Sequence, residues 1–296
     1  MLILRLKFCA TAAIVLLTHL GVGVCAEDFQ LNPVSRDVIE TRLGKYTGNN
    51  KKREATLRQL FVEARCSDQN ISEQQVKGSK LPSVICLLPG SSDKVIIVGT
   101  HFDRVSDGDG VVDNWSSASL LPSFYEGLKN GPHKHTYIFI GFTDEEQGEV
   151  GSRFYARQMT KDQVAATDAM VNMDTLGLGP AKVWVSHSDK RLTDALVQTA
   201  KKLNLPVAGV NVEQIGASSD AEQFAERKIP RIAIHSFTQE AFDDRIIHTS
   251  KDKLSGGITS GELDIPPAFS VPQIAPAVRA PVAAFWVANI SFLGVF

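Results

Sequence analysis

The sequence predicts an α/β protein: a three-layer sandwich with a mixed, mostly parallel sheet and helices on both faces. Short apolar runs alternate along the chain with longer segments whose apolar residues recur at helical spacing. Several of the short runs are apolar at successive positions, as in strands that are covered on both faces. With 43% hydrophobic and 22% charged residues and a net charge of −2, the composition is that of a globular protein and offers no basic excess for nucleic acid.

The expected elements follow from these two periodicities. The apolar runs expected to form strands are 83–88, 94–100, 136–142, 169–173, 182–186 and 231–234. The segments expected to form helices are 35–46, 53–64, 116–128, 150–159, 189–203 and 219–226. Ser219 and Glu222 have the spacing of a capping box at the start of the last helix. The basic residues 51–53, which lie beside a turn, are expected to be solvated.

The N-terminus has the features of a secretory signal peptide. Arg5 and Lys7 precede an apolar run, and small residues lead to a cleavage position after Ala26. We therefore expect a signal peptide over 1–26 and a secreted or periplasmic protein, with an uncleaved membrane anchor as the alternative. The apolar tail 282–296 is shorter than the roughly 20 residues that span a bilayer, so a last core helix is expected there and no stable membrane partner.

Cys66 and Cys86 are the cysteines that remain after cleavage. An oxidising compartment favours a disulfide between them, which would stabilise the fold by about 3 kcal/mol. Two reduced, partly buried thiols are the alternative.

Polar residues follow three of the expected strands at the point where each strand ends. His101 and Asp103 follow the run 94–100, Glu145 and Glu146 follow 136–142, and Asp174 follows 169–173. In an open α/β sheet, functional residues gather beyond the carboxyl ends of the strands. We therefore expect these side chains at one rim of the sheet.

Two further polar signals lie in loops, at Asp113 and at His248. A set of two histidines and several carboxylates suits a borderline metal such as zinc. Five groups are too many for one catalytic zinc but fit two ions that share a carboxylate. Each residue alone is more often a turn former or a satisfied polar group, so the prediction depends on their joint position at the rim.

The ordered motifs of this region resemble those of the co-catalytic zinc exopeptidases. This family is typified by secreted bacterial leucine aminopeptidases and includes glutamate carboxypeptidases and glutaminyl cyclases. The matching stretches, between about residues 94 and 254, are Gly-Thr-His-Phe-Asp at 99–103, Val-Asp-Asn-Trp-Ser at 112–116, Glu-Glu-Gln-Gly at 145–148 with Gly-Ser at 151–152, Asn-Met-Asp at 172–174, Ser-Asp at 219–220 and His-Thr-Ser-Lys-Asp at 248–252.

The resemblance implies a single zinc exopeptidase catalytic domain over 27–296 and two Zn²⁺ ions per chain. The implied ligands are His101 and Asp174 for one ion, Glu146 and His248 for the other, and Asp113 as the bridge. Glu145 would be the general base that activates a metal-bound water, and Asp103 would accept the free N–H of His101 and fix its tautomer. The implied substrates are peptides with a free N-terminus.

The chain departs from the family pattern at a tyrosine that often precedes the Ser-Asp element to support the oxyanion. Ile215 stands at about that position, and Ala221 follows Ser-Asp where histidine is frequent. The expected activity is that of a secreted dizinc aminopeptidase. A glutaminyl cyclase, a carboxypeptidase and a catalytically inactive binding module are the alternatives. Outside the ligand set, His235 ends a strand near the rim, where it could line a pocket.

Overall fold

The structure, a computed structural model, describes residues 34–178, 182–202, 208–211, 218–237 and 243–254. The expected signal peptide (1–26), the position of Ile215 and the apolar tail 282–296 lie outside these residues. Among the described residues, no helix is both long and apolar enough to cross a membrane.

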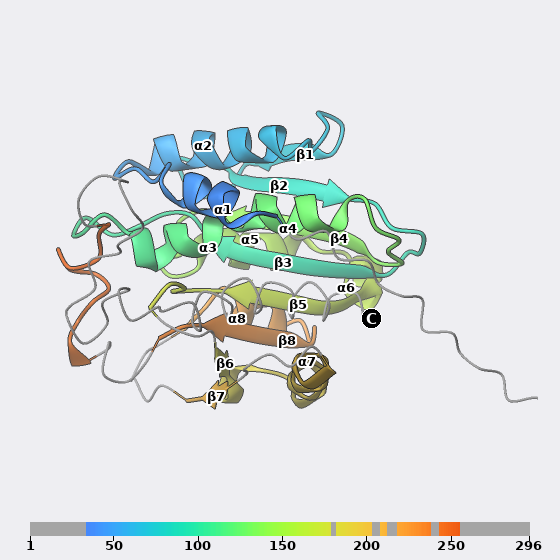
Figure 1. Cartoon of the computed structure of the whole chain (residues 1–296). Helices are drawn as coiled ribbons and strands as arrows, with labels where there is room; N and C mark the ends of the chain where they lie inside the picture. Colours follow the sequence, from blue (N-terminus) through green and yellow to red (C-terminus); the bar gives the residue numbers. More distant parts are fainter. Residues whose placement is uncertain (1–33, 179–181, 203–207, 212–217, 238–242, 255–296) are drawn as a thin grey trace, which may run out of the picture.

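The core of the molecule is one mixed sheet with the strand order β1-β2-β4-β3-β5-β8-β6-β7 (Figure 1). Strands β4, β3, β5 and β8 are parallel neighbours, β1 and β2 add antiparallel strands on one side, and β6 runs antiparallel to β8 on the other. The strands are β1 (Ile71–Gln74), β2 (Ser83–Leu88), β3 (Val95–His101), β4 (Thr136–Phe142), β5 (Thr167–Met173), β6 (Lys182–Trp184), β7 (Ala208–Val210) and β8 (Arg231–His235).

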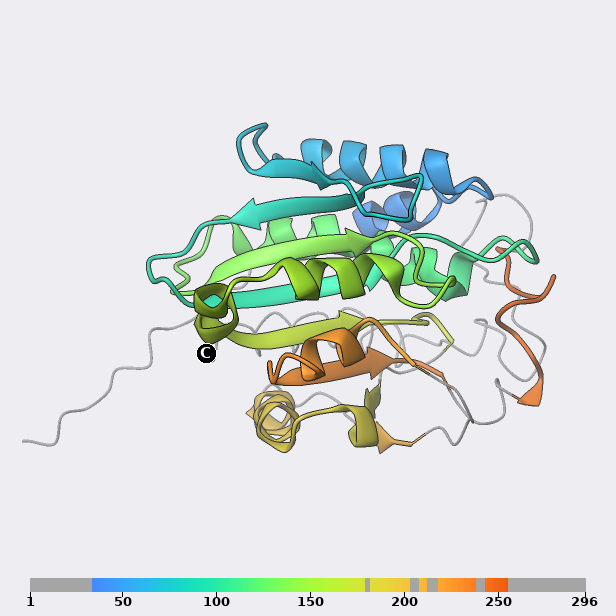
Figure 2. The same cartoon turned by 180° about the vertical axis from the view of Figure 1, so that it is seen from behind.

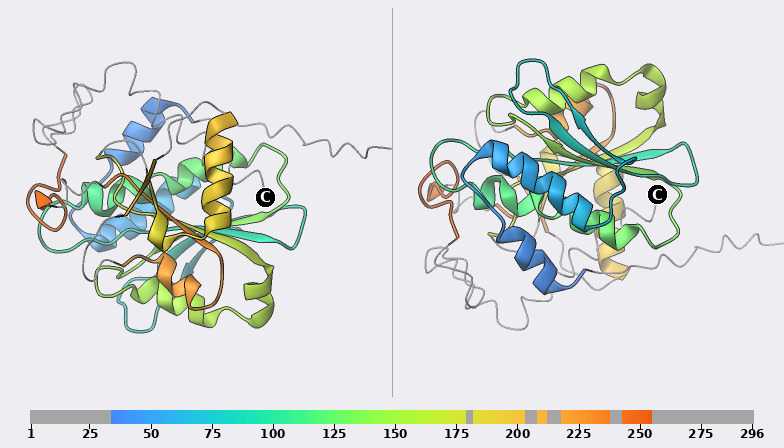
Figure 3. Two further views of the ribbon diagram at one scale, coloured as in Figure 1. Left: turned by 90° about the horizontal axis from the view of Figure 1, so that it is seen from below. Right: turned by 90° about the horizontal axis from the view of Figure 1, so that it is seen from above.

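Helices cover both faces of the sheet, so the expected three-layer sandwich is confirmed (Figures 1–3). One face carries α1 (Arg36–Leu43), α2 (Asn50–Glu63), α3 (Ser116–Ala118), α4 (Leu121–Leu128) and α7 (Lys190–Lys202). The other face, in front in Figure 2, carries α5 (Val150–Gln158), α6 (Lys161–Ala166) and α8 (Ala221–Ala225).

Successive residues of the central strands pack into the two different layers. On β3, Ile96 and Val98 belong to the cluster that contains Leu57 of α2, whereas Ile97 belongs to the cluster that contains Phe224 of α8. This alternation explains why these strands are apolar at successive positions.

Most expected elements are observed, and the differences have local causes. The helix expected over 116–128 is divided into α3 and α4, because Pro122 lies in the first turn of α4 and starts a new helix there. The capping box expected at Ser219 and Glu222 was wrong, since α8 has no side-chain cap hydrogen bond. The expectation missed β1, β7 and α6, which are short.

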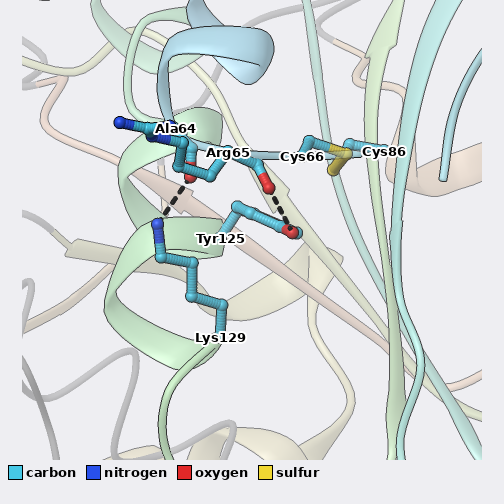
Figure 4. The surroundings of a disulfide bond; sticks show 6 residues. All are labelled: Ala64, Arg65, Cys66, Cys86, Tyr125 and Lys129. Carbon is cyan, nitrogen blue, oxygen red and sulfur yellow. Dashed lines mark hydrogen bonds between the residues drawn. A yellow bond between two sulfur atoms is a disulfide. The ribbon is translucent and has the colours of Figure 1, made fainter. Parts of the chain in front are cut away.

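The disulfide between Cys66 and Cys86 is present, so this expectation is confirmed (Figure 4). It joins the segment after α2 to β2. Tyr125 of α4 and Lys129, which directly follows α4, hold the same segment: the Tyr125 hydroxyl donates to the carbonyl of Arg65 at 3.1 Å, and the Lys129 ammonium donates to that of Ala64 at 2.7 Å. The covalent link and these hydrogen bonds fix the position of α2 against the sheet.

Candidate metal centre and active site

The parallel strands β3, β4 and β5 bring their carboxyl ends to the same edge of the sheet. His101 is the last residue of β3, and its backbone lies opposite Phe142, the last residue of β4. Asp174 directly follows β5, and its N–H donates to the carbonyl of Ile234 at 2.9 Å. The strand ends therefore lie side by side, as the sequence predicts.

All five predicted ligands meet around Asp113. His101 Nε2 lies 3.2 Å from Asp113 Oδ1, and His248 Nε2 lies 3.0 Å from Asp113 Oδ2. His101 Nε2 is also 3.7 Å from Asp174 Oδ1, whereas His248 Nε2 is 3.0 Å from Glu146 Oε2. The two carboxylate oxygens of Asp113 thus face two separate groups of ligands.

The backbone around Asp113 is held by a carboxylate that the sequence analysis gave no role. Asp252 accepts hydrogen bonds from the N–H groups of Val112, at 2.7 Å, and of Asp113, at 3.0 Å. Its side chain is buried, and burial raises its pKa to about 6. Asp252 is the last residue of the motif that begins at His248, so the sequence marked it as a residue of interest. Nothing in the sequence indicates that Asp252 contacts the loop of Asp113.

Asn114 joins the strand ends to the same loop. Its Nδ2 donates to Thr100 Oγ1 at 2.9 Å, and its Oδ1 accepts from the N–H of Thr175 at 3.1 Å. The peptide bond between Asp113 and Asn114 is cis. These contacts fix the direction in which the loop presents the Asp113 side chain to the cluster.

Asp103 contacts both His101 and the pair Glu145–Glu146. Its Oδ1 lies 3.5 Å from His101 Nδ1, and its backbone carbonyl lies 3.2 Å from the same atom. The carboxylate also accepts the N–H of Glu145 at 3.0 Å and the N–H of Glu146 at 3.3 Å. Asp103 therefore positions the loop after β4 as well as the imidazole.

The ionisable groups of the cluster shift one another strongly. Burial lowers the pKa of His101, but the charge of Glu145 and hydrogen bonds to neighbouring carboxylates outweigh burial and raise it well above its usual range. Hydrogen bonds to Asp113 and Glu146 raise the pKa of His248 to about 10. Burial raises the pKa of Asp113, but hydrogen bonds to both histidines outweigh it and lower that pKa strongly. Burial, together with the charges of neighbouring aspartates, raises the pKa of Glu145 to about 10.

The residues present fit a divalent metal ion. Ligand atoms of His101, Asp113 and Glu146 all lie within 4.8 Å of one another. Oε1 of Glu146 is buried without a hydrogen-bond partner among the described residues. Imidazole nitrogens and carboxylate oxygens are the donors that zinc accepts. A cation would satisfy the unpaired oxygen and neutralise the crowded carboxylates.

A cavity of about 900 Å³ opens beside this cluster. Glu145, whose side chain is 14% exposed, lies in its wall together with the ligand side chains. Its other walls come from the ends of β5, β6 and β8, from the segment before α8 and from residues near His248. His235 also lines the cavity, which confirms the expectation that it could line a pocket near the rim. The cluster is therefore accessible to a molecule of peptide size.

An α/β sandwich with histidines and carboxylates gathered at the carboxyl edge of its sheet is typical of metal-dependent hydrolases. Residues 83–264 match Peptidase family M28, and because this match covers more than half of the sequence, the chain belongs to that family. The resemblance drawn from the motifs is thereby confirmed.

Sequence relatives match over short segments. The probable lipoprotein aminopeptidase LpqL of Mycobacterium tuberculosis is 33% identical over 88 residues, which cover 29% of this chain and 18% of that protein. Aminopeptidase YwaD of Bacillus subtilis is 28% identical over 108 residues, or 36% of this chain and 23% of that protein. The chain thus spans less than a quarter of the length of these two relatives.

Solved structures share the fold over a larger part of the chain. LapB from Legionella pneumophila aligns with a TM-score of 0.66 and 19% identity, over 88% of this chain and 71% of that one. A glutaminyl cyclase from an Acidobacteriales bacterium aligns with a TM-score of 0.64 and 17% identity, over 90% of this chain and 97% of that one. At these identities the likeness extends to the fold alone.

Proposed function

We propose that this member of family M28 is a secreted, zinc-dependent aminopeptidase that removes residues from free peptide N-termini. The observation that carries the proposal is the position of Asp113, whose two oxygens contact two different histidines. Aminopeptidases among the sequence relatives support the same activity class.

Two zinc ions would be held by the two groups of ligands that meet at Asp113. His101 and Asp174 would hold one ion, and Glu146 and His248 the other. The contacts of these pairs on opposite sides of Asp113 support this division. Zinc bound there would supply Lewis-acid chemistry, polarising the scissile carbonyl and lowering the pKa of a water molecule.

Glu145 would act as the general base. Its carboxylate lines the cavity, and its backbone N–H donates to Asp103. This hydrogen bond fixes the backbone position from which the Glu145 side chain extends. Glu145 would take a proton from the attacking water onto a carboxylate oxygen and deliver it to the nitrogen of the leaving amine. Its neighbour Glu146 faces His248, which leaves the two adjacent glutamates with separate tasks.

The charge of the cavity favours a free N-terminus. Outside the proposed zinc ligands, the carboxylates of Asp243 and of Glu149, which also pairs with Arg153, line the cavity, together with the guanidinium of Arg245. A protonated amine would be attracted to such a wall, whereas an acetylated N-terminus would not.

Mass spectrometry of mixed peptides would test the proposal. The recombinant protein is incubated, with and without a chelator, with peptides that carry free, acetylated and glutamine-initiated N-termini. Loss of one residue from free N-termini only, abolished by the chelator, is expected. Trimming from the carboxyl end, or loss of ammonia from glutamine peptides without cleavage, would contradict it. The second result would favour a cyclase, whose fold matches this chain over almost its whole length.

Export depends on residues 1–26 and is supported by the disulfide between Cys66 and Cys86, because disulfides persist in oxidising compartments. Intact-mass analysis of the protein recovered from the growth medium or periplasm would test it. A mature chain that begins at Glu27 is expected, and a retained leader in a membrane fraction would contradict cleavage.

A further inference from the structure

Buried polar atoms without hydrogen-bond partners are concentrated in the wall of the cavity. Besides Glu146, four of the lining residues have such an atom within the part of the chain that the structure describes: Asn172 Oδ1, Trp184 Nε1, Ser219 Oγ and His235 Nε2. Leaving a buried polar group unpaired destabilises the folded protein, so native proteins rarely keep one without a reason. Several in one wall indicate that a bound molecule completes them.

These side chains belong to one face of three neighbouring strands. Asn172 lies on β5, His235 on β8 and Trp184 on β6, and the residue before each of them packs in the core on the opposite face of the sheet. Ala233 lies opposite Asn172 in the pairing of β5 with β8 and also lines the cavity. A small residue at that point leaves room between the larger polar ones.

Two of the atoms are hydrogen-bond donors. His235 Nδ1 accepts the N–H of Phe237 at 3.1 Å, so the proton of the neutral ring is on Nε2. Burial, with a smaller contribution from Lys182, lowers the pKa of His235 to about 4, which keeps the ring neutral at physiological pH. The indole N–H of Trp184 can only donate, and the two rings lie next to each other with centroids 5.9 Å apart.

The other two atoms supply acceptors. Asn172 Oδ1 is a carbonyl oxygen, and the hydroxyl of Ser219 can accept or donate. Both residues are nearly inaccessible, at 1% and 2% exposure. Ser219 lies in the segment before α8, so this segment closes the side of the pocket that the three strands leave open.

Two donors beside two acceptors complement a carboxamide, whose oxygen accepts two hydrogen bonds and whose NH₂ group donates two. An aliphatic side chain would leave all four atoms unpaired, a carboxylate would leave Asn172 Oδ1 without a donor, and an ammonium would oppose the two donors. We propose that these residues form the side-chain subsite of the enzyme and that it selects peptides beginning with glutamine or asparagine. The proposal rests on the aminopeptidase activity proposed above.

The subsite is rigid before the substrate binds. The ring of Trp184 stacks on His187 with centroids 3.7 Å apart, and His187 Nδ1 lies 2.7 Å from Glu222 Oε1. Arg231 of β8 donates to the other oxygen of Glu222 at 3.0 Å. Because this chain of contacts fixes the indole, its N–H needs no reorganisation to meet a ligand.

The test compares peptides that differ only at the first residue: glutamine, asparagine, methionine, leucine and glutamate. Methionine has nearly the shape of glutamine without its polar atoms. A kcat/KM for glutamine or asparagine at least tenfold above that for methionine and leucine is expected, because the analogue leaves polar groups unpaired. Equal or faster cleavage of methionine or leucine peptides, or a preference for glutamate, would overturn the proposal.

Two variants and a matched control locate the effect. Trp184→Phe removes the donor and keeps a ring, and Ser219→Ala removes the hydroxyl. In each variant, the ratio of kcat/KM for the glutamine peptide to kcat/KM for the methionine peptide should fall several-fold towards one. Ser117 has a buried hydroxyl that likewise lacks a partner but lies outside the cavity. Ser117→Ala should leave the ratio unchanged, and an equal change in all three variants would contradict the subsite.

Calorimetry separates failure of the subsite from failure of the proposed activity. If no peptide is hydrolysed, the aminopeptidase proposal fails, and titration of the protein with L-glutamine and L-methionine then tests the subsite directly. At least tenfold tighter binding of glutamine, lost in Trp184→Phe, supports it. Equal affinities overturn it. Conversion of glutamine peptides to pyroglutamyl peptides overturns both proposals, because the carboxamide would then react at the metal cluster.

Discussion

The carboxylate of Asp103 accepts the backbone N–H of Glu145 at 3.0 Å. The same carboxylate lies 3.5 Å from His101 Nδ1, so one buried side chain connects a proposed metal ligand to the proposed general base. The distance between the two functional groups is therefore set by Asp103 and not by the loop after β4 alone.

Replacing Asp103 by asparagine should weaken both metal binding and catalysis. The amide keeps the size of the side chain, but its NH₂ group faces backbone N–H donors and the carboxylate charge beside His101 is lost. We expect metal affinity to fall by about 10–100-fold, the range found for partners of metal ligands, with a comparable loss of kcat. Competition titration against a zinc-binding dye measures the affinity. Asp68→Asn, at an exposed position, is the control, and wild-type affinity in Asp103→Asn would contradict the role.

Glu145 and Asp113 should respond differently to truncation. Glu145→Ala removes the proposed general base, so hydrolysis should fall by about 10²–10⁴-fold while metal binding persists. Asp113→Ala removes the carboxylate between the two ligand groups and should release both ions. Elemental analysis of the two purified proteins measures the difference. Full activity in Glu145→Ala, or an unchanged metal content in Asp113→Ala, would contradict the respective role.

The rim of the sheet could be predicted because each ligand-bearing strand ends in its own sequence signal. A mostly apolar run ends at His101, shortly before Glu145 and just before Asp174, and parallel neighbours bring such ends together. The joint occurrence of these ends with the motifs at Asp113 and His248 predicted which residues would be neighbours. Their assignment to two metal ions stays a prediction.

Other parts of the site depend on contacts between segments that carry no matching signal. The basic residues 51–53 were expected to be solvated, but they lie in α2, where Arg53 is fully buried and donates to the carbonyls of Phe102 at 3.1 Å and Gly110 at 2.8 Å. It thereby supports both ends of the loop between His101 and Asp113. Only the tertiary fold reveals that these carbonyls face the start of α2.

The polar subsite could not be predicted from the sequence either. It requires β8 to lie between β5 and β6, an order that does not follow the order of the chain. Periodicity predicts which face of a strand is apolar, but it does not predict which strands are neighbours. The sequence singled out three of its residues, His235 near the rim and Asn172 and Ser219 within motifs, but it did not show that they line one pocket.

His235 should make the fold sensitive to mild acid. Its pKa in the folded protein is lowered from 6.5 to about 4, mainly by burial. Below pH 6.5 His235 is protonated in the unfolded chain, whereas in the folded protein it is protonated only below about pH 4. The free energy of unfolding should therefore fall as the pH is lowered through this window. The loss from this group amounts to about 3 kcal/mol.

Urea unfolding of the wild type and of His235→Phe between pH 7 and pH 4 would measure this contribution. The variant lacks the titrating group, so its free energy of unfolding should decline less over the same range, by about 3 kcal/mol. Parallel curves for the two proteins would contradict a buried, neutral His235. Because the comparison is a difference, acid titration of the metal-binding carboxylates cancels to a first approximation.

The disulfide should account for a measurable share of the stability. Cys66 and Cys86 are separated by 20 positions, and closing a loop of this length in the unfolded chain is worth about 3 kcal/mol. The double variant Cys66→Ser with Cys86→Ser should therefore have a free energy of unfolding lower by about 3 kcal/mol. Its urea midpoint should fall accordingly. Reducing the wild type should produce the same shift, whereas a reductant should leave the double variant unchanged. A double variant as stable as the oxidised wild type would mean that Tyr125 and Lys129 hold the end of α2 without the covalent link.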